Sequence, residues 1–187
     1  MNNASNPLIE RFTLGERLLH AGVATAVLAL LGTGVLVWQK ADEWELWGVN
    51  VVSQGHVWLG GGLLVGAVAG YMLWGRRRHA PHAARRFNPG QRMALRVVQA
   101  VLGFLVASGV LLYLREFIQM AKPVKAAIRQ AHWLGAGAIA LFLLAHLAMV
   151  LAVPKNRGLL RGMVSGRVSR DTARRASPGW LPEGDAR

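Results

Sequence analysis

Four long apolar blocks, separated by short polar segments, dominate the hydrophobic pattern of the chain. Each block is close to the ~20 residues that an α-helix needs to cross ~30 Å of hydrocarbon. The rest of the chain is too short to cover four such helices in water, and no alternating strand pattern competes with the helical one. The blocks run from about Leu18 to Trp38, Val57 to Trp74, Ala94 to Leu114, and His132 to Val153.

The pattern therefore predicts an all-α fold, an integral membrane four-helix bundle. Local signals mark the helix ends, since Thr13 and Glu16 form a T-x-x-E capping box before the first block and Pro154 ends the fourth. We expect one transmembrane domain over residues 1–165 and a polar cytoplasmic tail over 166–187. The expected helices cover about 14–38, 55–75, 90–115 and 124–153.

The distribution of charge predicts how the chain is oriented in the membrane. The chain is 53% hydrophobic and yet has a formal net charge of +13. The segment between the first two blocks is net acidic, whereas the segment between the second and third has six arginines and no acid. More basic residues follow the fourth block, and they outweigh a mildly basic loop at Arg115–Arg129. The positive-inside rule then predicts a multi-pass protein of the bacterial cytoplasmic membrane with both termini in the cytoplasm. Nucleic acid is not an expected partner, because the basic residues flank lipid-length segments.

Cysteine is absent, which excludes disulfides, covalent c-type haem and any iron–sulfur cluster held by cysteines of this chain. The first residues lack the positive n-region of a secretory signal, so we do not expect a cleaved signal peptide.

Histidine is the side chain that points to chemistry, because four of the six histidines fall within the apolar blocks or at their ends. His79 and His82 lie among arginines and are expected to be solvated loop residues. His132 and His146 are 14 residues apart. At ~100° per residue, both project from one face of a helix, ~21 Å apart along its axis.

The expected topology arranges the four histidines in two cross-helix pairs. His56 and His132 lie at the outer membrane face, and His20 and His146 lie nearer the cytoplasm. A single intramembrane histidine is often only a hydrogen bonder between helices, but four at matched depths indicate metal ligands.

Haem is the cofactor that best fits two imidazoles without a further ligand. No Asp, Glu or Cys lies inside the blocks to complete a zinc or copper site. A porphyrin supplies four nitrogens itself, so two imidazoles complete six-coordination and close the iron to substrates. The sequence thus predicts two haems b with axial ligands His20, His56, His132 and His146, and a role in electron transfer.

Two further features are less specific. Gly62, Gly66 and Gly70 recur every four residues, either for close helix packing or to leave room for a flat macrocycle. Asn88 and Gln91 begin the third helix, where Asn88 is expected to be the N-cap. Their uncharged amides also suit hydrogen bonds to a quinone carbonyl, and the ring nitrogen of His146 that faces away from iron is a further donor.

Several segments together resemble the gamma subunit, cytochrome b, of respiratory formate dehydrogenases. The segment Arg11-Phe12-Thr13 with Glu16, Arg17 and His20 is similar to the family's R-F-T-x-x-E-R-x-x-H start, and the spacing of His132 and His146 matches. Residues 87–92 resemble the family's F-N-x-G-Q-K/R segment, and residues 162–174 resemble its tail. The resemblance covers essentially the whole chain.

The resemblance implies haem ligation by His56 with His132 and by His20 with His146. It implies reduction of menaquinone or ubiquinone near the inner haem, beside Asn88, Gly90 and Gln91. It also implies two partners, an iron–sulfur subunit and a molybdenum- or tungsten-dependent catalytic subunit on the outside.

The sequence therefore predicts the membrane cytochrome b subunit of a respiratory formate dehydrogenase. This subunit carries electrons to quinone and does not itself oxidise formate. Three alternatives remain open: the equivalent subunit of a hydrogenase or another molybdoenzyme, a stand-alone cytochrome b561-like quinone oxidoreductase, and a non-redox anchor or metal transporter.

Overall fold

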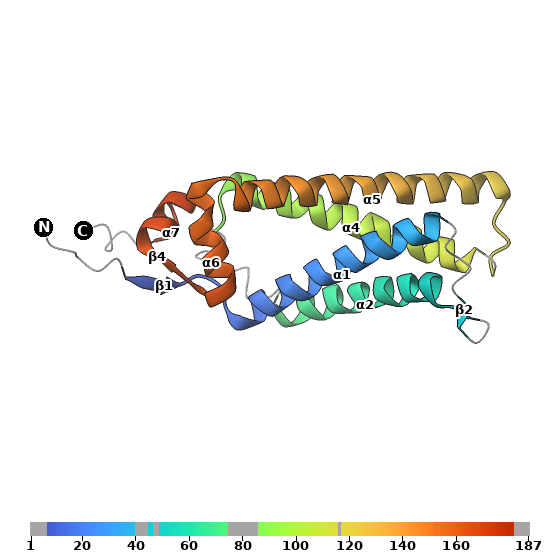
Figure 1. Cartoon of the computed structure of the whole chain (residues 1–187), viewed down its shortest axis with the longest axis horizontal. Helices are drawn as coiled ribbons and strands as arrows, with labels where there is room; N and C mark the ends of the chain where they lie inside the picture. Colours follow the sequence, from blue (N-terminus) through green and yellow to red (C-terminus); the bar gives the residue numbers. More distant parts are fainter. Residues whose placement is uncertain (1–6, 40–44, 47–48, 75–85, 116, 182–187) are drawn as a thin grey trace, which may run out of the picture. The chain divides into compact units, whose positions relative to one another are not determined.

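The computed structural model describes residues 7–39, 45–46, 49–74, 86–115 and 117–181. Within these residues, four long helices are the main elements (Figure 1). Each is long and apolar enough to cross a membrane, the second over Val51–Gly70. The prediction of four apolar helices is confirmed. Their bounds are Leu14–Trp38 (α1), Val51–Trp74 (α2), Pro89–Leu114 (α4) and Lys122–Leu151 (α5).

Three of the four helix starts have a side-chain cap. Before α1, the backbone N–H of Thr13 donates to Glu16 Oε2 (3.0 Å), and the N–H of Glu16 donates to Thr13 Oγ1 (3.3 Å), so the predicted capping box forms. The helix α2 begins four residues before its predicted start because Asn50 caps it, accepting from the N–H of Ser53 at 2.8 Å. This cap follows a short antiparallel pair, β2 (Glu45–Leu46) with β3 (Val49–Asn50).

Most large apolar side chains of the long helices face outward. The apolar windows of α1, α2, α4 and α5 are only 0, 6, 6 and 11% buried. The buried apolar residues of the described chain are few: Phe12, Ile139, Val168 and Ala173. Helices with so much exposed apolar surface are stable where hydrocarbon surrounds them, which agrees with the membrane topology.

The chain divides into two compact units, and each long helix contributes to both. One unit comprises residues 22–70 and 96–142. There, α5 approaches α4 closely at Gly135, where an added Cβ would lie 3.0 Å from Leu105 Cδ2. Trp38 of α1 also packs against Trp133 of α5, with ring centroids 4.8 Å apart and ring planes inclined at 56°.

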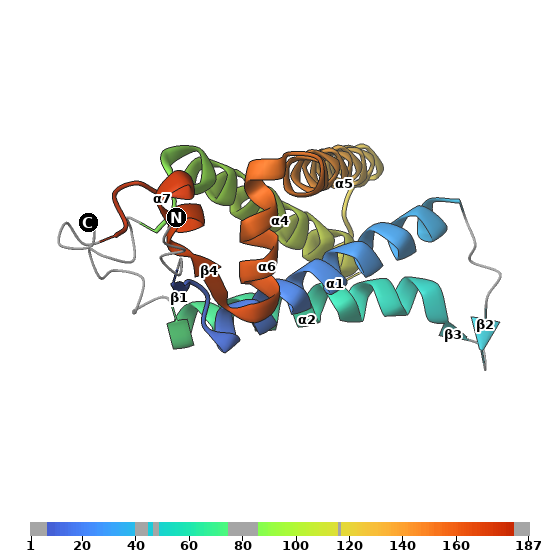
Figure 2. The ribbon, with the colours of Figure 1, turned by 60° about the vertical axis from the view of Figure 1, so that its left-hand side comes forward.

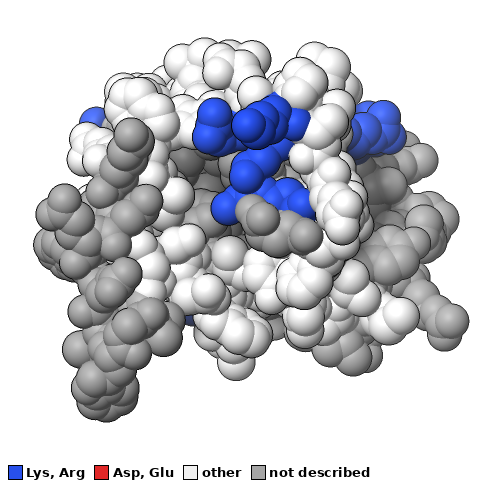
Figure 3. All heavy atoms as spheres, turned by 90° about the vertical axis from the view of Figure 1, so that its right-hand side faces the viewer, with Lys and Arg blue, Asp and Glu red and all other residues white. Residues whose placement is uncertain are grey.

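The same unit carries a basic group around the start of α5. Figure 3 looks onto this side, and basic side chains gather there without an acidic one in view among the described residues. This group belongs to the mildly basic loop, whose charge opposes the membrane orientation that the other basic segments predict. Its members are Arg115, Lys122, Lys125 and Arg129.

The other unit comprises residues 1–21, 71–95 and 143–187, and it contains small elements near both termini. Strand β1 (Leu8–Glu10) pairs antiparallel with β4 (Arg167–Ser169), and two short helices, α6 (Arg157–Ser165) and α7 (Arg170–Ala176), flank β4 in sequence (Figure 2). The turn from α6 into β4 needs Gly166, which has a φ of 84° and whose carbonyl accepts from Arg11 and Phe12. Residues 166–181 thus have their contacts within this unit.

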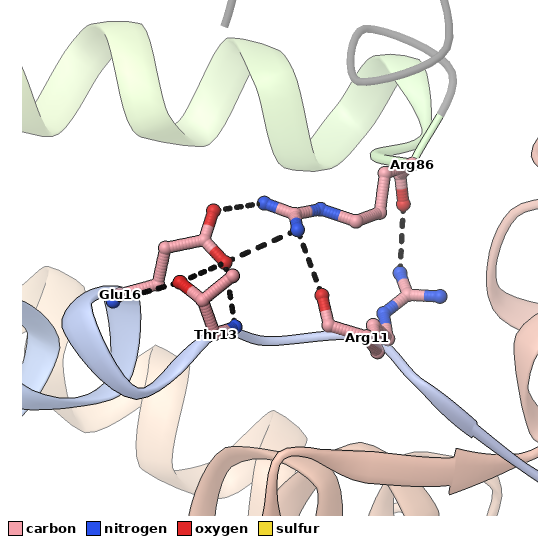
Figure 4. Close-up of polar contacts among 4 residues, drawn as sticks. All are labelled: Arg11, Thr13, Glu16 and Arg86. Carbon is pink, nitrogen blue, oxygen red and sulfur yellow. Dashed lines mark hydrogen bonds and ion pairs between the residues drawn. The ribbon is translucent and has the colours of Figure 1, made fainter. Parts of the chain in front are cut away.

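A polar cluster joins the segments of this unit (Figure 4). Arg86 forms a salt bridge with Glu16 and donates to the carbonyl of Arg11 at 2.7 Å. Arg11 in turn donates to the carbonyl of Arg86 at 2.7 Å, and Ser177 donates to the same carbonyl at 2.6 Å. Arg11 is only 1% exposed, and burial together with the charge of Arg86 lowers its pKa to about 10. Three segments that lie far apart in the sequence, around Arg11–Glu16, Arg86 and Ser177, are thus held together by hydrogen bonds.

Candidate functional site

The four histidines of the apolar blocks come together in two pairs. His20 of α1 and His146 of α5 have ring centroids 6.4 Å apart, with ring planes inclined at 48°. His56 of α2 and His132 of α5 have centroids 6.3 Å apart, with planes at 70°. These are the two pairs that depth and helical spacing predict from the sequence, and each pair lies within a single compact unit.

The separation within each pair suits one iron ion between two imidazoles. A metal–imidazole bond is ~2 Å long, and the ring centre lies about 1 Å beyond the nitrogen, so two axial rings have centres ~6 Å apart. The inclination of the planes is no obstacle, because ligation through one nitrogen of each ring does not require the two ring planes to be parallel. Among the residues that the structure describes, no third His, Cys, Asp or Glu joins either pair. The donor set therefore fits a haem, whose porphyrin supplies the other four ligands.

Two hydroxyl residues contact the His56/His132 pair and were not identified from the sequence. Thr33 Oγ1 lies 2.9 Å from His56 Nδ1, and Ser108 Oγ lies 2.8 Å from His132 Nδ1. The structure reveals them because each lies on the helix before its histidine, more than twenty residues away. The sequence pattern that could have identified them is a Thr or Ser followed by Gly within an apolar block.

The glycines near this pair have different roles. A Cβ at Gly34 would lie 3.3 Å from His56 Cε1, and a Cβ at Gly109 would lie 3.5 Å from His132 Cε1. Each glycine thus lets a histidine ring lie close to the backbone of a neighbouring helix. At Gly62 and Gly66, a Cβ would meet no described atom within 4 Å, so close helix packing does not explain these two positions.

The predicted quinone residues form the start of α4. Asn88 Oδ1 accepts from the N–H of Gln91 at 2.8 Å, and Gln91 Oε1 accepts from the N–H of Asn88 at 3.1 Å. This reciprocal cap confirms the expected N-cap role of Asn88. Asn88 Nδ2 also donates to the carbonyl of Ala176 at 3.4 Å. Gly90 lies in the first turn beside them, and the same compact unit contains His146.

His79 and His82, expected to be loop residues without a ligand role, lie outside the described residues.

Comparison with known families adds an identification to this geometry. The sequence profile of the family described as prokaryotic cytochrome b561 matches residues 11–166, which is most of the chain. The chain belongs to the prokaryotic cytochrome b561 family. The matched region includes all four histidines of the two pairs. A search of the curated proteins gave no match.

Membership of the cytochrome b561 family decides the class of the protein. It is a multi-pass prokaryotic membrane cytochrome that binds haem b and takes part in electron transport. The family match agrees with the donor set of the two histidine pairs. It argues against a non-redox anchor or a metal transporter.

Proposed function

We propose that this cytochrome b561-family protein is the membrane subunit of a respiratory formate dehydrogenase. In this proposal it carries electrons from an outward-facing iron–sulfur subunit, through two haems b, to quinone at the cytoplasmic side. The observation that carries the proposal is the presence of two histidine pairs, each with the ring spacing that one iron ion requires.

Four side chains have the central role. His56 and His132 hold one haem, and His20 and His146 hold the other, each through a neutral ring nitrogen. When bound, the haem supplies reversible one-electron chemistry. Two imidazoles would complete the coordination of a haem, so these residues would keep small molecules from the iron and restrict the site to electron transfer.

The contacts within one compact unit support the formate dehydrogenase assignment. The three segments that resemble the gamma subunit lie in the same unit: residues 11–20, 87–92 and 162–174. Within it, Phe12 of the first segment lies against Gly162 of the third, where an added Cβ would be 3.6 Å from Phe12 Cε2, and Asn88 of the second donates to the carbonyl of Ala176, two residues after the third. Segments that are similar to one family and also pack together are better support than separate short motifs.

Quinone reduction is assigned to Asn88, Gly90, Gln91 and His146. The cap of α4 uses the amide oxygens of Asn88 and Gln91, and Asn88 Nδ2 donates one proton to Ala176, so the donors assigned to a quinone carbonyl are the second proton of Asn88 Nδ2 and the NH2 group of Gln91. The ring nitrogen of His146 that faces away from iron is assigned as a further contact of the quinone, which would couple ligand and substrate. Quinone reduction here takes protons from the cytoplasm while electrons arrive from outside.

The orientation follows from the positive-inside rule. The arginine-rich segment that ends at Arg92 and the basic residues after Pro154 assign both termini to the cytoplasmic side of the inner membrane. The basic group at the start of α5 then faces outward, where the iron–sulfur subunit and the molybdenum or tungsten subunit are proposed to bind.

A second candidate is a stand-alone quinone oxidoreductase of the same cytochrome b561 family. Mild solubilisation of native membranes and purification through a tag on this chain separates the two. Co-purifying iron–sulfur and molybdenum or tungsten proteins, with haem reduction on adding formate, support the first proposal. Reduction by hydrogen instead indicates the subunit of a hydrogenase. Isolation of the chain alone, with neither donor effective, favours the stand-alone enzyme.

A further inference from the structure

The hydroxyl groups beside the His56/His132 pair form two equivalent arrangements on two pairs of helices. Thr33 of α1 contacts His56 of α2, and Ser108 of α4 contacts His132 of α5, in each case at Nδ1. Each hydroxyl also donates within its own helix, to the carbonyl of Ala29 or of Phe104, both at 2.8 Å. Each oxygen thus lies between a backbone carbonyl and a ring nitrogen.

Counting protons assigns the roles in both arrangements. With the proposed ligation through Nε2, the one proton of the neutral ring is on Nδ1, so the hydroxyl oxygen accepts it and the hydroxyl's own proton is left for the backbone carbonyl. A neutral imidazole with a proton on Nδ1 has its lone pair on Nε2, so Nε2 is the nitrogen available to a metal. In the opposite tautomer Nδ1 is an acceptor, and the hydroxyl would turn its proton from the backbone carbonyl to the ring.

A glycine follows each hydroxyl residue and fixes the ring from a second direction. The Cβ positions of Gly34 and Gly109 lie 3.3 Å from His56 Cε1 and 3.5 Å from His132 Cε1. The hydrogen bond and this backbone contact together define the rotation of each ring. Ser108 is only 4% exposed, so water does not replace its hydrogen bond easily.

We propose that Thr33 and Ser108 are positioning residues that hold both ligands of this haem in the Nδ1–H tautomer and lower its midpoint potential. The inference rests on the proposed ligation by His56 and His132. The physical cause is that an acceptor at Nδ1–H increases the electron density of the imidazole, which favours the oxidised, more positive iron. Hydroxyl acceptors on both ligands make the effect act twice at one iron. A lowered potential suits the point at which electrons enter.

The test is a redox titration of the purified protein, followed by its optical spectrum, with haem content measured in parallel. The Thr33→Val/Ser108→Ala variant removes both hydroxyls with little change in volume. Thr33→Ser keeps the hydroxyl, and Thr25→Val is the matched control, because Thr25 lies on the same helix with an exposed side chain. The component under test is the one that His56→Ala removes.

We expect the double variant to raise the midpoint potential of that component and leave the other component unchanged. Thr33→Val alone should give a smaller shift in the same direction, whereas Thr33→Ser and Thr25→Val should titrate as the unmodified protein.

The inference is overturned if the component keeps its potential without the hydroxyls, or if Thr33→Ser shifts it as much as Thr33→Val. If the double variant loses that haem, the comparison of Thr33→Val with Thr33→Ser decides by the same criteria. If His56→Ala removes no haem, the proposed ligation by His56 is wrong. If His56→Ala removes one haem but the hydroxyl variants leave its midpoint potential unchanged, only the present inference is overturned.

Discussion

His56 on α2 and His132 on α5 face each other with ring centroids 6.3 Å apart, although they are far apart in the sequence. His20 and His146 repeat nearly the same separation, 6.4 Å, between α1 and α5. Two histidine pairs with nearly the same ring separation indicate that each pair can coordinate one metal ion in the same way. Helix α5 contributes one histidine to each pair. Because these two histidines project from the same face of α5, one helix face supplies a ligand to both sites.

The first prediction is two haems b per chain, bound without a covalent link because the chain has no cysteine. A pyridine haemochrome assay with amino-acid quantification of the protein measures the ratio. A ratio of one would mean that one histidine pair serves only helix packing.

The second prediction concerns which histidines share a haem. His56→Ala and His132→Ala should each remove the same redox component, because either change leaves iron with one axial ligand. His20→Ala and His146→Ala should remove the other component. Redox titrations of the four variants give the assignment. Loss of one common component in His56→Ala and His20→Ala would show that the pairs are wrongly assigned.

The third prediction concerns His79 and His82. Both lie in the arginine-rich segment outside the apolar blocks, so His79→Ala/His82→Ala should leave haem content and both midpoint potentials unchanged. The optical spectrum of the double variant measures this. Loss of either haem would contradict the ligand assignment.

The fourth prediction separates the cap of α4 from quinone binding. Because Asn88 and Gln91 cap each other, alanine at either position would weaken the helix start as well as any substrate contact. Asn88→Ser/Gln91→Glu retains a capping box and removes both amide NH2 groups. We expect both haems to be retained and reoxidation by a quinone analogue to slow on the order of tenfold, the effect of losing about one hydrogen bond.

Stopped-flow reoxidation after reduction with dithionite measures the rate in this variant. Each single substitution serves as the comparison. Unchanged reoxidation in the double variant, with both haems normally reduced, would place quinone reduction elsewhere, most simply at the outer face.

The fifth prediction concerns the stability of the unit that contains both termini. Glu16 accepts from the N–H of Thr13 and pairs with Arg86, so Glu16→Ala removes a cap and leaves Arg86 without its carboxylate. We expect the free energy of unfolding to fall by about 1–3 kcal/mol. Thermal unfolding in detergent measures the loss. Glu10→Ala in β1 is the control, since an exposed side chain should change stability by about 0.5 kcal/mol or less.

The sequence by itself determined the number of long helices and the four histidines worth pairing. Both follow from one-dimensional information: a hydrophobic run has to match the bilayer, and helical periodicity puts His132 and His146 on one face of α5. The caps of α1 and α4 were also predictable, because Thr13 with Glu16 and Asn88 with Gln91 interact within one turn.

Only the tertiary structure decided which groups support the ligands and what the C-terminal segment does. Thr33 and Ser108 look like ordinary polar residues of apolar helices until α2 and α5 bring His56 and His132 against them. The three-residue strands β1 and β4 carry no readable alternation, and their pairing joins the two ends of the chain. These contacts depend on the packing of distant segments, which local propensity and hydrophobic periodicity do not encode.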